Sequence, residues 1–283
     1  GSFFPFRANW KHHFSQILWS LENSLPPNLI WDVLKFVHHD LAGLFNWLMR
    51  NIKHLFFDLD HTLWDFEKNS EIALHLLFHD LGLNQQIVDF AAFHKTYKEQ
   101  NSALWKLYGK GELIKEELRF LRFEITLEAF GIRDRTIIDE LSDGYVEISP
   151  RQTALHKGAI ETLEQLKNEG YLMHIITNGF KEVQYIKLEN SGLAPFFETV
   201  VCSEELGKNK PAPEIFYHSL YKAGAKNHHS VMIGDDPEVD IIGAINAGMK
   251  GILFDPHDAH RTPHSAVKIK ELSELADILV WLK

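Results

Sequence analysis

The chain has 283 residues, of which 45% are apolar and 24% are charged, and its formal net charge at pH 7 is -10. These values predict a globular protein. The acidic balance argues against binding of a nucleic-acid polymer, which needs a basic surface. No apolar run approaches the roughly 20 residues of a membrane-spanning helix. Cys202 is the only cysteine, so no disulfide can form within the chain, which fits a reducing cytoplasm.

The first 50 residues precede the part of the chain that carries recognisable motifs. The first two of them look like the remnant of a tag. After Pro27, apolar side chains recur at helical spacing between residues 30 and 48 and predict an amphipathic helix. We expect this helix to pack on its own domain or on a second subunit. The first methionine is Met49, so residues 3–48 are either an accessory extension or not native.

Residues 54–65, HLFFDLDHTLWD, are the stretch around which the rest of the chain is organised. The apolar run 55–57 predicts a strand buried on both faces, as in the middle of a parallel sheet. Asp58 and Asp60 follow where the strand ends, which is the edge where open α/β sheets bind ligands. Thr62 comes next and is expected to brace the loop.

Two carboxylates at a strand end can share a reaction. One can attack an electrophile while its neighbour moves the proton of the leaving group or of water. Clustered negative charge repels a phosphate, so this interpretation requires a hard cation, and Mg2+ is the cation that fits oxygen ligands and phosphate substrates. The alternative is that Asp58 and Asp60 are ordinary turn residues after a strand.

Between residues 66 and 150 the apolar periodicity is helical throughout and predicts a bundle of four helices. We expect Asn69 and Ser70 to cap the first helix, and the second to run from about Gln86 to Tyr108. The third carries Ile114, Leu118, Leu121 and Ile125, and the fourth carries Ile137, Ile138, Leu141 and Tyr145. The bundle follows directly after the acidic loop, which suggests a lid that excludes water.

After Pro150 the pattern alternates between helix and strand. A predicted strand at 171–176 ends in Thr177, Asn178 and Gly179 before a helix begins. A hydroxyl and free backbone N–H groups at such a turn can bind a phosphate, although a simple helix cap has the same sequence signature.

Two further strands follow and bring charged residues. The strand at 199–203 precedes GKNKPAPEIF, in which Lys210 can neutralise both a nucleophile and a phosphate, although a lysine in a loop is usually only solvated. The strand at 230–233 leads into Asp235 and Asp236, and the next helix carries Asp240 in its first turn. A strand at 251–254 is expected to close the series before a tail helix.

The motifs coincide at one place, because each falls at the C-terminal end of a predicted parallel strand. The fold class predicted is therefore α/β, a doubly wound, mainly parallel, Rossmann-like sheet with an inserted four-helix bundle. We expect a core domain at residues 51–65 and 151–283, a helical cap domain at 66–150 and an N-terminal helical extension at 1–50.

The motifs DLDHTLWD, ITNGF, KPAPEIF and GDDPEVDIIGAINAG resemble, in the right order, the four motifs of the haloacid dehalogenase superfamily. The resemblance covers about residues 52–282 and is to phosphatases that carry a helical cap between the first and second motifs. NSALWKLYGKGEL with LRFE in the cap, and ITNGF in the core, resemble the branch of pyrimidine 5′-nucleotidases. That branch hydrolyses nucleoside monophosphates such as dUMP, UMP and dTMP.

The resemblance implies a role for each motif residue. Asp58 attacks phosphorus and forms an aspartyl-phosphate. Asp60 protonates the leaving oxygen and then deprotonates water, for which its pKa must be raised. Thr177 and the backbone N–H of Asn178 hold the phosphoryl oxygens, and Lys210 offsets the charge.

The resemblance also implies the remaining ligands. Mg2+ is bound by the side chains of Asp58 and Asp235 and by the backbone carbonyl of Asp60, and Asp236 or Asp240 orients its waters. Trp105 and Arg122 of the cap are candidate substrate contacts, although bundle core or surface is the ordinary role of such residues. The expected partner is a small phosphorylated metabolite, and the protein is a monomer or a homodimer.

Other functions remain open. A phosphatase or mutase for a sugar phosphate or phosphoglycolate has the same core. A 2-haloacid dehalogenase uses the same nucleophile but needs no second acid, so Asp60 speaks against it. In a phospho-accepting receiver domain the acidic pair comes before the other motif residues in the sequence and no cap is inserted, so both features argue against this function. A non-catalytic binding protein is expected to have lost one of these groups.

Overall fold

The structure is a computed structural model, and it describes residues 52–282. The helix predicted between residues 30 and 48, and the extension before Met49, lie outside the described residues. Among the residues that are described, no helix is long and apolar enough to cross a membrane.

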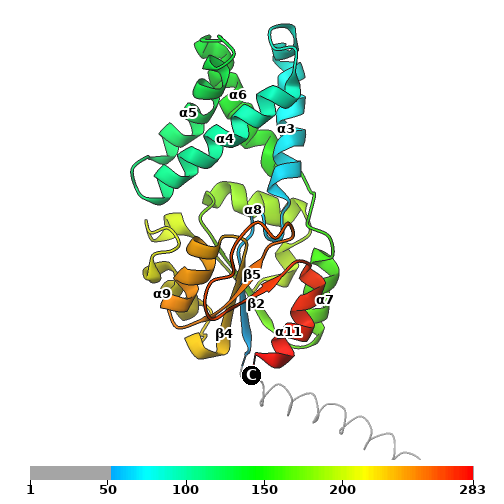
Figure 1. Ribbon diagram of the computed structural model, residues 1–283, viewed down its shortest axis with the longest axis vertical. Coiled ribbons are helices and arrows are strands. Elements are labelled where there is room, and N and C mark those ends of the chain that lie inside the picture. The colour runs from blue at the N-terminus through cyan, green and yellow to red at the C-terminus, as the bar shows by residue number, and fades with distance from the viewer. Residues whose placement is uncertain (1–51, 283) are drawn as a thin grey trace, which may run out of the picture. The chain divides into compact units, whose positions relative to one another are not determined.

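Six parallel strands form one sheet in the order β3-β2-β1-β4-β5-β6 (Figure 1). Their bounds are β1 (His54–Phe57), β2 (Leu172–Thr177), β3 (Thr199–Cys202), β4 (Ser230–Gly234), β5 (Lys250–Phe254) and β6 (Ala266–Ile269). The strand order reverses between β1 and β4, so the C-terminal ends of β1, β2 and β4 border the crevice where such sheets bind ligands. The predicted parallel, doubly wound sheet is confirmed.

One expectation about the sheet is wrong, because the strand at 251–254 does not close the series. β6 follows it and pairs in parallel with β5 at the edge of the sheet. Its sequence, AVKI, is short and carries Lys268 in its interior, and three of its four residues are only half-buried. An edge strand of this kind lacks the apolar run by which the buried strands are recognised.

Helices cover both faces of the sheet. Alternate residues of β1 point to opposite faces, so the strand contributes side chains to a core on each face. On one face, Leu55 and Phe57 pack in a core with α7 (Ala159–Asn168), α8 (Lys181–Asn190) and α11 (Leu275–Trp281). On the other, Phe56 packs with α9 (Pro213–Lys222) and α10 (Gly243–Asn246). All four residues of β1 are buried.

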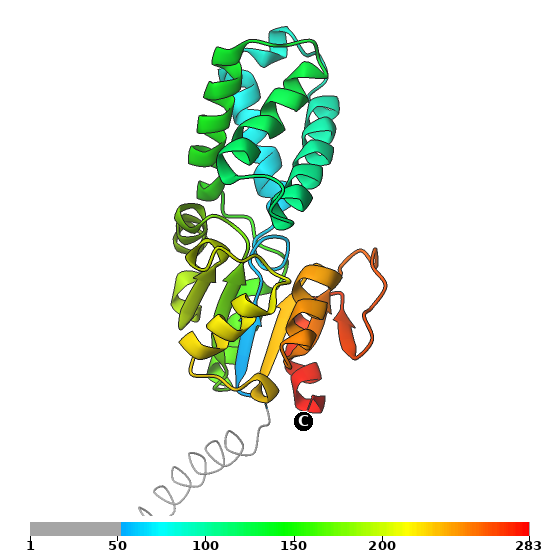
Figure 2. The same ribbon diagram turned by 90° about the vertical axis from the view of Figure 1, so that its left-hand side faces the viewer.

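Four of the helices that lie between β1 and β2 in the chain gather at one end of the sheet (Figure 2). They are α3 (Phe66–Asp80), α4 (Phe90–Gly109), α5 (Lys115–Glu128) and α6 (Arg135–Ile148), and they share an aromatic core that includes Phe78, Phe93 and Phe123. The four predicted helices are therefore present. The exact division into a core domain and a cap domain stays a prediction.

The helix starts differ from the expectation. Asp65 caps α3 by accepting a hydrogen bond from the backbone N–H of Lys68, so Asn69 and Ser70, predicted as caps, are buried inside the helix. Asp89 caps α4, which therefore starts at Phe90 and not near Gln86. Both corrections have one cause: an aspartate that accepts from the first turn fixes the start, whatever apolar periodicity precedes it.

Asn69 joins the two points at which the chain passes between sheet and helices. Its Nδ2 donates to the carbonyl of Ala154 and its Oδ1 accepts from the Ala154 N–H, both at 2.8 Å. The N–H of Asp65 also donates to the Ala154 carbonyl, at 3.0 Å. We call these three hydrogen bonds the Asn69 clasp.

Candidate active site

The ends of β1 and β4 bring three carboxylates together. Oxygens of Asp58, Asp235 and Asp240 lie within 4.8 Å of one another. Asp58 follows β1 directly, and its N–H donates to the carbonyl of Ile233 in β4 at 2.9 Å, which fixes the two strand ends side by side. Asp240 comes from a short π-helix, Pro237–Ile242. The predicted convergence of Asp58 and Asp235 at one rim of the sheet is therefore present.

Lys210 lies in this acidic cluster and is only 2% exposed. Its Nζ donates to Asp58 Oδ1 at 2.5 Å, to Asp240 Oδ1 at 2.6 Å and to the carbonyl of Ile176 at 2.8 Å. All three ammonium hydrogens therefore have acceptors. Burial alone would lower the pKa of Lys210, but the carboxylates of Asp240 and Asp58 outweigh burial and raise this pKa.

The carboxylates carry more negative charge than one lysine balances. Burial raises the pKa of Asp58 to about 7, against the effect of Lys210 and with that of Asp240. Burial, Asp240 and Asp58 likewise raise the pKa of Asp235. Thr62 Oγ1 donates to Asp235 Oδ1 at 3.3 Å, which agrees with its expected bracing role. The carboxylate oxygens of Asp58, Asp235 and Asp240 are largely buried and carry surplus negative charge, and such a group of oxygen ligands suits a hard divalent cation.

The predicted phosphate-binding turn follows β2. Thr177 Oγ1 accepts hydrogen bonds from the Gly179 N–H at 3.0 Å and from Gln184 Nε2 at 2.9 Å. The Asn178 side chain faces the lysine loop: its Nδ2 donates to the Lys210 carbonyl at 3.0 Å, and its Oδ1 accepts from the Lys210 N–H at 2.8 Å. Asn178 therefore fixes the backbone that presents Lys210, a contact that sequence analysis did not anticipate.

The side chain of Asp60 is engaged elsewhere. Its Oδ1 accepts from Lys187 Nζ at 2.5 Å and its Oδ2 accepts from Gln184 Nε2 at 2.8 Å. Its carboxylate is not part of the group formed by Asp58, Asp235 and Asp240. Burial would raise the pKa of Asp60, but Lys187 outweighs burial and lowers it. The raised pKa expected for Asp60 is therefore wrong for this structure.

Sequence analysis missed Gln184 and Lys187. They are spaced i, i+3 on α8 and are both buried, so they occupy one face of the helix. Glutamine and lysine are usually exposed, so nothing in their type marks them. The signal that could have found them is their position in the helix that begins directly after the Thr177 turn, where one face must point back to the strand ends.

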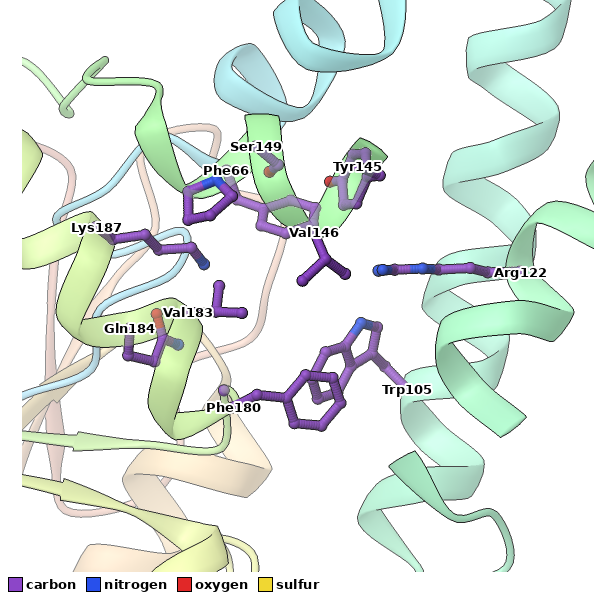
Figure 3. Close-up of a pocket in the computed structure, with 12 residues that line it drawn as sticks. Phe66, Trp105, Arg122, Tyr145, Val146, Ser149, Phe180, Val183, Gln184 and Lys187 are labelled. Carbon is purple, nitrogen blue, oxygen red and sulfur yellow. The ribbon is translucent and has the colours of Figure 1, made fainter. Parts of the chain in front are cut away.

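A cavity of about 50 Å3 lies between the helices and the sheet (Figure 3). Trp105 and Arg122 reach into it from α4 and α5, and Lys187 and Gln184 reach in from α8. The Trp105 ring stacks on Phe180 with the ring centroids 5.3 Å apart. The structure therefore places both predicted cap residues beside the site. That they contact a substrate stays a prediction.

Arg122 is 5% exposed, and within residues 52–282 its charge faces aromatic rings and forms no ion pair with an acid. Its guanidinium lies 4.7 Å from the Tyr145 ring centroid and 4.9 Å from that of Phe123. Its Nε has no hydrogen-bond partner in the described part of the chain. A buried guanidinium at a cavity wall can bind an electronegative atom there.

Three proteins named as nucleotidases or phosphatases are similar to this chain in sequence. Pyrimidine 5′-nucleotidase PynA from Streptococcus pneumoniae is 32% identical over 232 residues, which are 80% of this chain and 94% of that protein. Pyrimidine 5′-nucleotidase YjjG from Escherichia coli is 32% identical over 230 residues, 80% of this chain and 96% of that protein. Glyceraldehyde 3-phosphate phosphatase from Pyrococcus furiosus is 31% identical over 237 residues, 82% of this chain and 94% of that protein.

A solved structure and a family model complete the comparison. The HAD-hydrolase YfnB from Bacillus subtilis, crystallised with magnesium and described as showing interdomain movement, has a TM-score of 0.73 and 30% identity. The match covers 81% of this chain and 99% of that one. The family model for haloacid dehalogenase-like hydrolases matches residues 52–248. The chain therefore belongs to the haloacid dehalogenase-like hydrolase family.

Proposed function

We propose that this hydrolase is a Mg2+-dependent phosphomonoesterase that forms an aspartyl-phosphate on Asp58, with pyrimidine nucleoside monophosphates as its preferred substrates. The observation that carries the proposal is the contact of Lys210 with both Asp58 and Asp240, next to Asp235. A nucleophilic carboxylate, a fixed cation and a set of oxygen ligands are what phosphoryl transfer requires of a protein.

The first step forms the phosphoenzyme. Asp58 attacks phosphorus, the bond to the leaving oxygen breaks, and that oxygen takes a proton from Asp60. Asp60 must therefore be protonated in the substrate complex, although Lys187 lowers its pKa in this structure. Thr177 and the backbone N–H of Asn178 hold the phosphoryl oxygens, while Lys210 offsets the charge shared between them and Asp58. Asp58, Asp235 and the Asp60 carbonyl would hold Mg2+, and the bound cation would supply positive charge that favours the ionised forms of Asp58 and Asp235 and neutralises the phosphoryl group.

The second step releases phosphate. Asp60, now a carboxylate, takes a proton from water, whose oxygen attacks phosphorus. The bond between phosphorus and Asp58 breaks, and its electron pair returns to the Asp58 carboxylate. The protonated Asp60 is then ready for the next leaving group, so the cycle is balanced.

The cavity supports the choice of substrate. The Trp105 and Phe180 rings offer aromatic surface for contact with a nucleobase, and the Arg122 guanidinium at the cavity wall can donate to a carbonyl oxygen of that base. A pyrimidine presents such carbonyl oxygens, and PynA and YjjG are named as pyrimidine 5′-nucleotidases. The alternative is a sugar phosphate or another small phosphorylated metabolite, which the Pyrococcus relative favours.

A substrate panel tests the proposal. Release of phosphate from UMP, dTMP, AMP, ribose 5-phosphate and p-nitrophenyl phosphate is measured with Mg2+ and with EDTA. We expect turnover only with metal and the highest kcat/KM for UMP or dTMP. Asp58→Asn, which is nearly isosteric, should fold normally and release no phosphate. Metal-independent turnover, or none at all, would contradict the phosphatase, and a preference for ribose 5-phosphate would contradict the nucleotidase.

A matched pair of cap variants tests the role of Arg122. We expect Arg122→Met to lower kcat/KM for UMP about ten- to hundredfold, with little change for p-nitrophenyl phosphate, because a hydrogen bond to a charged donor contributes about 1.5–3 kcal/mol. Arg119 lies on the same helix, is more exposed and pairs with Asp143, so Arg119→Met serves as the control. An equal loss on both substrates would argue against recognition of the base.

A further inference from the structure

The Asp60 carboxylate is held by two side chains of one helix. Lys187 binds one oxygen at 2.5 Å and Gln184 binds the other at 2.8 Å. Gln184 also donates to Thr177 Oγ1 at 2.9 Å, so it ties Asp60 to the phosphate-binding turn. With both of its oxygens bound, Asp60 has little freedom to rotate.

The ammonium group of Lys187 has few contacts available other than the one with Asp60. It is 4% exposed, and its Nζ lies 4.3 Å from the centroid of the Trp64 ring and 5.8 Å from that of Phe66. Within residues 52–282, Asp60 is the only carboxylate with which it forms an ion pair. A buried ammonium between aromatic rings and one acid cannot swing into solvent as a surface lysine does. The lysine therefore has a fixed position relative to Asp60.

We propose that Lys187 is a positioning residue for hydrolysis of the aspartyl-phosphate: with Gln184 it holds Asp60 in the orientation in which Asp60 accepts a proton from the attacking water. The proposal rests on the proposed function. Lys187 neither gains nor loses a proton. The proton passes from water to Asp60 as the oxygen of that water bonds to phosphorus and the bond from phosphorus to Asp58 breaks.

The two chemical steps can be separated with p-nitrophenyl phosphate, whose good leaving group needs little protonation. If Lys187 positions Asp60 for hydrolysis, Lys187→Met should slow the second step and leave the first nearly intact. Rapid mixing should then show a burst of nitrophenolate approaching one equivalent per active site. The steady-state kcat should fall about a hundredfold, the lower end of the range for acid–base catalysis. Intact mass after an acid quench should show phosphorylated protein.

Controls separate this inference from the function on which it rests. Lys181→Met removes an exposed lysine at the start of the same helix and should behave like the wild type. Lys187→Gln keeps a hydrogen-bond donor without the charge and should show a smaller defect. Absence of turnover in the wild type would contradict the proposed function itself.

Three results would overturn the role of Lys187 in an active enzyme. One is a Lys187→Met variant that keeps its kcat. Another is a variant that loses kcat without a burst and without accumulated phosphoenzyme. The third is failure of both Lys187 variants to fold in circular dichroism and thermal melting, which would assign the lysine a purely structural role.

Discussion

At the scale of single residues, two buried histidines sit together inside the sheet. His54 Nδ1 lies 3.1 Å from His174 Nε2, and His174 Nδ1 lies 2.9 Å from Thr199 Oγ1. Burial, and then the neighbouring His54, lower the pKa of His174 to about 3, and burial also lowers the pKa of His54. Both rings are therefore neutral in the folded protein at neutral pH, and neither can be protonated without the cost of a buried charge.

This pair predicts a loss of stability in acid. In the unfolded chain His174 binds a proton below its ordinary pKa of 6.5, whereas the folded protein binds it only near pH 3, so the stabilisation present above pH 6.5 is lost as the pH falls through this window. At pH 5 the loss from His174 should be about 2 kcal/mol, at 1.36 kcal/mol per pH unit. Urea unfolding at pH 7 and pH 5 measures it.

A matched variant isolates the effect. His174→Gln should destabilise the protein at pH 7 but should lose less free energy of unfolding between pH 7 and pH 5 than the wild type. His228, which is exposed, provides the control, and His228→Gln should follow the wild type. Equal pH dependence in the wild type and His174→Gln would show that His174 is not the group that titrates.

At the scale of elements, the turn from β2 into α8 depends on a glycine. A Cβ on Gly179 would overlap Gln184 Nε2 and would lie 2.5 Å from its Cδ. The colliding group is a side-chain amide, so Gly179→Ala should displace Gln184 and leave the backbone nearly in place. Because Gln184 Nε2 binds both Asp60 and Thr177, we expect kcat to fall about tenfold or more.

The thermal midpoint should meanwhile change by only a few degrees, since no backbone contact is lost. At Gly109, the last residue of α4, an added Cβ would meet no described atom within 4 Å outside its own turn of helix, so Gly109→Ala should leave kcat unchanged and should not lower the midpoint. Steady-state kinetics and a thermal melt on the three proteins measure both quantities. A Gly179→Ala variant with full activity would show that the Gln184 amide is dispensable.

The elements also show how far sequence reasoning reaches. β1 and the position of Asp58 could be predicted, because a short apolar run predicts a strand buried on both faces and Asp58 follows directly where that run ends. β6 could not be predicted, because an edge strand with Lys268 in its interior has no such run. Asp240 joins the carboxylate cluster from the helix after β4, whereas the meeting of Asp58 and Asp235 followed from strand ends. The partner of Asp60 did not, since it depends on which face of α8 turns inward, and only packing decides that.

At the scale of the whole molecule, the helical layer touches the sheet layer through an ion-pair cluster. Lys115, at the start of α5, binds Glu182 Oε1 at 2.7 Å and Glu204 Oε1 at 2.8 Å, and its Nζ lies 4.6 Å from the centroid of Phe180. Asn209 Nδ2 also donates to the Tyr108 carbonyl at 3.2 Å. These contacts hold the helices against the cavity that carries Trp105 and Arg122.

Lys115→Met should loosen this contact without unfolding the protein. Partly exposed ion pairs contribute about 1 kcal/mol or less each, so we expect KM for UMP to rise a few-fold with little loss of kcat. The wild-type KM should also rise with salt, and the variant should lose that dependence. Kinetics at low and high ionic strength measure both effects.

The control for Lys115→Met removes one positive charge at a position away from the contact of Lys115 with Glu182 and Glu204. Arg133 pairs with Glu128 on the cap surface, so Arg133→Met alters an ion pair within the helical layer alone. It should leave KM and its salt dependence unchanged. A similar rise in KM in both variants would point to a general effect of charge and would argue against a role for the contact of Lys115 with Glu182 and Glu204.

The Asn69 clasp has a mechanical consequence. It joins the two segments that connect the sheet to the helices, at Asn69 and Ala154, so it is the point about which the helical layer would pivot. If the helical layer tilts about this point, Asp60 and Trp64, a few residues away along the chain, shift little, whereas Arg122 on α5 moves relative to them. Such a hinge lets a ligand enter and leave while the reacting groups keep their alignment.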